Sequence, residues 1–139
     1  MTAATAGVDA ERVARWFERL PSLVAGDADL IRRGRFLTCD FEIGIGSLPL
    51  MVSVAEGRVS SVARGPFLLR PWVFAIRMSA ADWLQFLRPI PEPGWHDIMA
   101  LTKLGAARVE GNLQPFMANL QYVKDVLAAP RALTKDLAA

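Results

Sequence analysis

The side chains that could do chemistry in this 139-residue chain are few and widely spaced. His96 is the single histidine and Cys39 the single cysteine. A zinc site needs three or four good ligands, and a nucleophilic cysteine needs a neighbouring base, so neither residue alone indicates metal binding or covalent catalysis. Gly44-Ile45-Gly46 lacks the third glycine and the following helix of a dinucleotide-binding turn. We therefore expect no catalytic residue, no metal and no cofactor.

Asp40 and Glu42 are spaced as an acid pair on one face of a predicted strand. Inside a cone-shaped fold such a pair could serve an enzyme of the ketosteroid isomerase kind. Arg108 and Glu110 alternate with apolar residues in the same way near the end of the chain. Charged residues in this pattern are more typical of a solvent-facing sheet surface with cross-strand partners. A small isomerase-like enzyme is therefore kept only as an alternative.

The composition narrows the classes of function further. Hydrophobic residues make up 53% of the chain, which favours either an apolar cavity or an alanine-rich core. The net charge of +2 is too small and too dispersed for a nucleic-acid interface. With one cysteine, no secretory signal pattern and no apolar run of about 18 residues, the chain is expected to be cytoplasmic. Its length predicts one domain, residues 1–139.

Period-two alternation predicts a sheet. Leu37, Cys39, Phe41, Ile43 and Ile45 alternate with polar residues, and Glu56-Gly57 is typical of a tight hairpin. The expected strands are Arg35–Gly46, Leu50–Ala55, Arg58–Arg64, Trp72–Met78 and Ala106–Asn112. We predict an α+β fold with a single five-stranded, mostly antiparallel sheet and helices packed on one face.

Period-3.6 patterns predict the helices. The first starts at Asp9 and carries Val13, Trp16, Phe17 and Leu20 on one face. Ser79 and Asp97 are expected to cap two middle helices, and Pro115 to start a last helix. That last helix would bury a stripe of Phe116, Leu120, Val123 and Leu127 and end at Pro130. Residues 1–8 and 131–139 are expected to be flexible.

Three segments resemble the sterol carrier protein type-2 family. They are Ile76–Trp83, Leu101–Leu104 and Ala107–Asn112, where Glu110-Gly111-Asn112 stands at the turn that leaves the family's final strand. The resemblance covers about residues 35–127. It implies an apolar tunnel between sheet and helices that binds sterols, fatty acyl chains or acyl-CoA. The chain departs from the family at Pro89–Gly94, a proline-rich loop that could reshape the mouth of a pocket.

The resemblance and the apolar faces together predict a set of ligand-binding residues. One strand and two helices carry more large apolar surface than one sheet face usually needs, although ordinary core packing would use the same residues. Arg77, a charge inside the most apolar strand, should pair with an acid or reach solvent, and could face an anionic group. The predicted ligand-binding residues are Trp72, Phe74, Ile76, Arg77, Trp83, Phe86, Leu87, Phe116, Met117 and Leu120.

The function expected from the sequence is non-catalytic binding of a hydrophobic small molecule or lipid. The alternative is an accessory or protein-interaction domain whose core is filled. The first helix, with Trp16, Phe17 and three arginines, could contact a membrane surface, although such helices more often pack on their own domain. The sequence also leaves a homodimer open.

Overall fold

The computed structural model describes residues 3–135, and only the backbone of residues 3–6. Its centre is one sheet in the order β3-β2-β1-β4-β5. Strands β1 and β4 pair in parallel and all other neighbours pair antiparallel, which confirms the predicted sheet. The strands are β1 (Cys39–Ile45), β2 (Leu48–Ala55), β3 (Arg58–Arg64), β4 (Phe74–Met78) and β5 (Ala107–Gly111).

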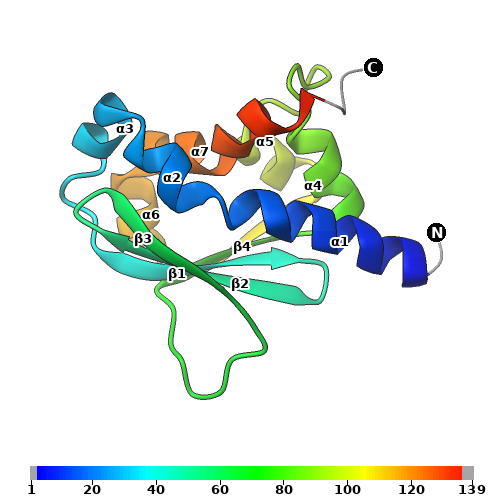
Figure 1. Ribbon diagram of the computed structural model, residues 1–139, viewed down its shortest axis with the longest axis horizontal. Coiled ribbons are helices and arrows are strands. Elements are labelled where there is room, and N and C mark those ends of the chain that lie inside the picture. Colours follow the sequence, from blue (N-terminus) through cyan, green and yellow to red (C-terminus); the bar gives the residue numbers. More distant parts are fainter. Residues whose placement is uncertain (1–2, 136–139) are drawn as a thin grey trace.

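The helices form a second layer on one face of the sheet (Figure 1). The predicted caps are present: Asp82 N donates to Ser79 Oγ at 3.1 Å, and Met99 N donates to Asp97 Oδ1 at 2.8 Å. The helices are α1 (Ala3–Phe17), α2 (Leu20–Ala25), α3 (Ala28–Arg33), α4 (Ala80–Phe86), α5 (Ile98–Lys103), α6 (Leu113–Ala118) and α7 (Leu120–Ala128), followed by the 3-10 helix η1 (Ala129–Leu133).

The turn of the β2–β3 hairpin has the backbone conformation that Glu56-Gly57 predicted. Glu56 and Gly57 both have positive φ, at 50° and 82°, as a tight turn between antiparallel strands requires. A Cβ at Gly57 would also overlap the backbone of Ile31 and Gly34. Glycine at this position therefore serves both the turn and the close approach of the α3 segment.

The two ends of the chain differ from the sequence-based expectation. Helix α1 begins at Ala3, six residues earlier than predicted, and α2 and α3 follow it as separate short helices. After Pro130 the chain continues in η1, and buried Thr134 donates its hydroxyl to the Leu87 carbonyl. The parts of the expected flexible ends at residues 1–2 and 136–139 lie outside the described residues.

The predicted last helix is two helices because of Asn119. This residue has non-helical dihedral angles, with φ −123° and ψ 32°. Its side-chain Nδ2 donates to the carbonyl of Pro115 at 3.0 Å, a local bond that competes with continued helix. The predicted stripe is nevertheless buried on both sides of the break: Phe116, Val123 and Leu127 lie in the core, and Leu120 packs against it.

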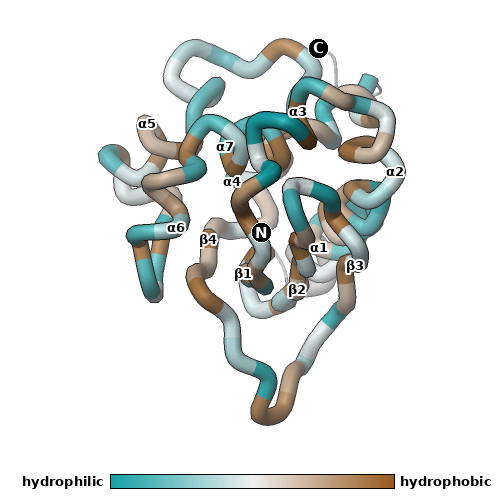
Figure 2. The backbone as a smooth tube through the Cα atoms, turned by 90° about the vertical axis from the view of Figure 1, so that its left-hand side faces the viewer, coloured by the Kyte–Doolittle hydropathy of each residue, from teal (hydrophilic) through white to brown (hydrophobic). Residues whose placement is uncertain are grey.

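The core lies between the sheet and the helix layer. Phe41, Ile43 and Ile45 of β1 point to this side and are fully buried. Their neighbours Asp40, Glu42 and Gly44 belong to the opposite face, because side chains alternate along a strand. Residues 65–73, which join β3 to β4, extend away from the helix layer as a long loop (Figures 1 and 2).

Candidate functional site

Most of the predicted ligand-binding side chains lie together between the sheet and the helices. Each of them is at most 1% exposed and packs in one continuous cluster. These residues are Phe74, Ile76, Trp83, Phe86, Leu87 and Phe116. The structure thus brings them together as expected, but in a closely packed interior in which they contact one another.

Phe74 is at the centre of one aromatic group. Its ring stacks on Phe41 of the neighbouring strand, with centroids 5.0 Å apart and planes 8° apart. Its other side meets the edge of Phe116 from α6 at 5.4 Å. The order Phe41, Phe74, Phe116 therefore runs from the sheet to α6.

Trp83 of α4 holds a second aromatic group. Its ring contacts Phe17 at 5.2 Å and Phe86 at 5.7 Å, both in edge geometry. The indole N–H donates to the carbonyl of Gly44 at 2.9 Å, so this buried polar group is satisfied. Phe17 is fully buried in this contact and is not available to a membrane surface.

Trp72 and Arg77 lie on the other face of the sheet. Arg77 Nη1 is 2.7 Å from Glu42 Oε1, and its Nε is 3.3 Å from Glu110 Oε1, which confirms that it pairs with acids. Its guanidinium also sits 5.5 Å from the centre of the Trp72 ring. Burial lowers the pKa of Arg77, but the two carboxylates outweigh this and raise it. Arg77 also lines a depression of about 320 Å³, where the anion-facing role stays a prediction.

Asp40 and Glu42 also belong to this far face. Glu42 is 7% exposed, more buried than the sequence suggested, and is held by Arg77. Asp40 lies 3.6 Å from the guanidinium of Arg70. The two carboxylates therefore neutralise arginines and do not line the aromatic interior.

Met117 is placed differently from the rest of the predicted set. It is 52% exposed on α6, whereas Leu120 is partly buried against the core. Met117 follows buried Phe116 by one residue and so points about 100° away from it around α6, toward solvent.

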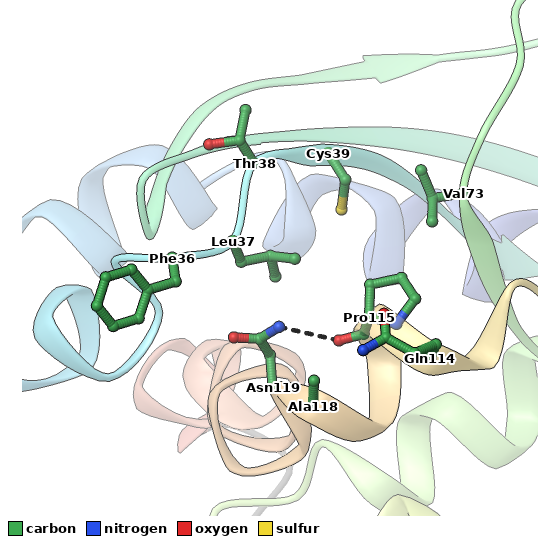
Figure 3. A pocket seen from close by; sticks show the side chains of 9 residues that line it. All are labelled: Phe36, Leu37, Thr38, Cys39, Val73, Gln114, Pro115, Ala118 and Asn119. Carbon is green, nitrogen blue, oxygen red and sulfur yellow. Dashed lines mark hydrogen bonds between the residues drawn. The ribbon is translucent and has the colours of Figure 1, made fainter.

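A groove of about 590 Å³ opens between the start of β1, the residue before β4, and α6. Figure 3 shows Leu37 and Cys39 facing α6 across it, with Val73 at one end and Phe36 at the other. The lining residues are Phe36, Leu37, Thr38, Cys39, Val73, Gln114, Pro115, Ala118 and Asn119.

The groove is lined by uncharged side chains. Thr38 Oγ1 accepts from Glu56 N at 3.0 Å. Burial, with a smaller contribution from the Asp40 carboxylate, raises the pKa of the Cys39 thiol to about 11. The guanidinium of Arg35 stacks 4.4 Å from the ring centre of Phe36, which lines the rim of the groove. The lining combines apolar side chains with Thr38, Gln114 and Asn119, so it favours an uncharged ligand, with the Arg35 guanidinium at its edge.

Within residues 3–135, no group of three or more His, Cys, Asp or Glu side chains is placed to hold a metal ion. His96 is exposed, and neighbouring Asp97 is engaged with Lys124 Nζ at 2.8 Å. Burial raises the pKa of Asp97, but the bonds from Lys124 and Met99 N outweigh it and hold that pKa below its usual value. Within the same residues, every helix is too short or too polar to cross a bilayer.

Comparison with known proteins places the architecture. No family model and no curated protein sequence matches the chain. Among solved structures, a crystal structure of sterol carrier protein 2 superposes with a TM-score of 0.67 at 10% identity, covering 84% of this chain and 94% of that one. The chain has the sterol carrier protein 2 fold. Similar matches are the sterol carrier protein domain 2 of Helicoverpa armigera (TM-score 0.55, 16% identity, 82% and 86% covered) and sterol carrier protein 2 from Yarrowia lipolytica (0.51, 13%, 86% and 89%).

In this sterol carrier protein 2 fold, the groove lies beside the aromatic interior. Cys39 and Phe41 are two residues apart on β1 and so share its helix-facing side. Phe116 lies between two groove residues of α6, Pro115 and Ala118, with its ring against Phe74. Leu37 lines the groove and belongs to the buried core, and Cys39 and Val73 pack against that core, so the groove borders the aromatic cluster.

Sequence reasoning missed the groove residues. Cys39 was expected only as one of the alternating apolar residues of the first strand, and the α6 residues were assigned to one long helix. A usable signal was present at Leu37 and Cys39, which continue the apolar period of β1 up to and beyond its first residue. The α6 side of the groove could not be predicted without the break at Asn119.

Proposed function

We propose that this protein binds a hydrophobic molecule without catalysing a reaction on it. The ligand class is a fatty acyl chain, an acyl-CoA or a sterol-like lipid, held between the sheet and the helices. The ligand enters through the groove beside α6. The observation that carries this proposal is an uncharged groove that shares the buried side chain of Leu37 with the apolar core.

The size and chemistry of the groove support this proposal. Its volume of about 590 Å³ falls within the roughly 300–1,000 Å³ of typical small-molecule sites. Each methylene transferred from water contributes about 0.8 kcal/mol, so an alkyl chain needs few polar contacts. Arg35, stacked on Phe36 at the rim, would meet a carboxylate or phosphate at the end of such a chain. The fold shared with proteins named sterol carriers agrees with the same class of ligand.

Deeper entry of a long chain requires movement of α6. This helix has six residues, and Phe116 is its buried side chain. Leu113 and Met117 on the same helix are 45% and 52% exposed. Rotation of Phe116 away from Phe74 would join the groove to the interior while breaking few other contacts of the helix.

A second candidate function is an accessory domain that holds no ligand. The observation in its favour is the closed interior, where Phe74, Ile76 and Trp83 are fully buried against their neighbours. Such a domain would act through its surface.

Titration with a fluorescent fatty acid tests the proposal. Ala118 is exposed and lines the groove, so Ala118→Trp fills the groove without entering the core. We expect the variant to bind at least tenfold more weakly than the wild type at an unchanged Tm. Met117→Trp is the matched control, because it adds the same ring to the adjacent exposed residue, which does not line the groove.

Native mass spectrometry of the purified wild type completes the test. A copurifying lipid that is absent from Ala118→Trp would support the binding function and identify the ligand. A wild type that neither carries a lipid nor binds fatty acid, acyl-CoA or sterol in titration would refute it and favour the accessory domain.

A further inference from the structure

The loop at residues 65–73 presents a bare apolar tip. It projects from the sheet on the side opposite the helix layer, and its tip is strongly hydrophobic (Figures 1 and 2). Leu68 is 89% exposed and Leu69 is 94% exposed, the two most exposed large apolar side chains among the described residues. Two adjacent leucines kept in water are unfavourable unless another surface covers them.

The backbone holds this tip outward. At the first arm of the loop, Gly65 N donates to Pro49 O at 2.9 Å. At the second arm, Val73 N donates to Asp40 O at 2.9 Å, so both arms are fixed to the sheet. Leu69 itself has φ 56°, a left-handed conformation that L-residues with a side chain rarely adopt. The exposure of the leucines is thus a feature of a loop with fixed ends.

Aromatic and arginine side chains surround the base of the leucine tip. The guanidinium of Arg70 lies 5.3 Å from the ring centre of Phe67, and that of Arg77 lies 5.5 Å from the ring centre of Trp72. No aspartate or glutamate occurs between Gly57 and Ala81. An apolar tip flanked by aromatic rings and arginines matches the change of polarity across a membrane interface.

The size of the tip favours lipid over a protein partner. At most about 100 Å² of apolar surface comes from each leucine side chain. A stable protein interface needs roughly 800 Å² on each partner, with matching shape. A small convex tip falls far short of that area, whereas insertion into fluid lipid needs no complementary surface.

We propose that the β3–β4 loop docks the protein on a phospholipid bilayer. Leu68 and Leu69 enter the edge of the acyl-chain region, while Phe67, Arg70 and Trp72 lie at the level of the headgroups. The ion pairs of Arg70 with Asp40 and of Arg77 with Glu42 already neutralise these arginines, so insertion of the leucines carries the binding and headgroup charge matters little. This docking does not depend on ligand binding in the groove.

Sedimentation with large unilamellar vesicles tests the proposal on the full chain. The vesicles are phosphatidylcholine, alone or with about one fifth phosphatidylglycerol. We expect the wild type to bind both, and L68S/L69S to bind about 100-fold more weakly, or about tenfold for each leucine removed. Ile90→Ser is the control, because Ile90 is 85% exposed but lies in another loop and should leave binding unchanged.

The Tm and the fatty-acid titration of the double variant separate a loss of membrane binding from a loss of folding. L68S/L69S changes exposed side chains, so its Tm and its fatty-acid titration without vesicles should equal those of the wild type. A wild type that does not sediment with either vesicle, or a double variant that binds like the wild type, would overturn the docking proposal. Neither result would bear on the groove, which the fatty-acid titration tests separately.

Discussion

At the scale of single residues, Cys39 offers a direct probe of the groove. Its thiol faces α6 and has a pKa raised to about 11 by burial. Because the thiolate is the reactive form, we expect iodoacetamide to react with Cys39 at pH 8 about 100-fold more slowly than with an unperturbed thiol. The rate should rise with pH until about 11. Mass spectrometry of the alkylated protein measures it.

The control for this measurement is the chain unfolded in guanidinium chloride, in which Cys39 is no longer shielded by the groove. Bound ligand should slow the native reaction further. Equal rates for native and unfolded protein at pH 8 would contradict the partly buried position of the thiol.

Gly34 makes a second prediction at this scale, about stability. A Cβ at this position would overlap the ring of Tyr122, which is fully buried and donates its hydroxyl to Gly57 O at 2.7 Å. Gly34→Ala should therefore lower the free energy of unfolding by about 1–3 kcal/mol, as overpacking does elsewhere. Gly26→Ala, where a Cβ meets its nearest atom at 3.6 Å, is the control and should be close to neutral in a urea titration.

At the scale of elements, Arg64 joins β3 to α1. Its Nη2 is 2.6 Å from Glu18 Oε1, and its Nη1 contacts Glu11 Oε2. The hydrogen bond from Arg64 is the largest cause of the lowered pKa of Glu11. A carboxylate with a depressed folded pKa contributes stability above its unfolded pKa of about 4.3 and loses it as pH falls through the folded value.

Arg64→Met should consequently lower the Tm at pH 7, and the difference from the wild type should shrink in acid. Thermal melts at several values between pH 3 and pH 7 measure this difference. An Arg32→Met control, which removes an exposed pair with Asp29, should change the Tm little. A difference that stays constant down to pH 3 would contradict a contribution from the ionised carboxylates of Glu11 and Glu18.

The elements also show what the sequence could and could not predict. Alternation along β1 and the Glu56-Gly57 turn were enough to predict β1 and the β2–β3 hairpin, because both patterns are local. The split at Asn119 depends on one side-chain bond to Pro115, which no period reveals. The same limit applies to Phe74 and Arg77, whose opposite faces follow from alternation but whose partners on β1 and β5 depend on strand order.

At the scale of the whole molecule, the groove and the exposed loop share one segment. Val73 lines the groove, and it is also the last residue of the loop before β4. Asn112 is the N-cap of α6, and its backbone N donates to the Val73 carbonyl at 2.8 Å. The proposed docking loop, the mouth of the groove and the start of α6 are therefore linked through this residue.

This arrangement predicts an uneven stability across the fold. The β1 strand is hydrogen-bonded on both sides and buries Phe41, Ile43 and Ile45, whereas α6 has one buried side chain. Elements with few buried contacts open at low free energy, so amides of Leu113–Ala118 should exchange with deuterium much faster than those of β1. Added fatty acid should slow exchange in α6 and leave β1 unchanged. Hydrogen-exchange mass spectrometry follows both segments at once. If α6 were as protected as β1 in the free protein, it could not serve as the moving side of the groove.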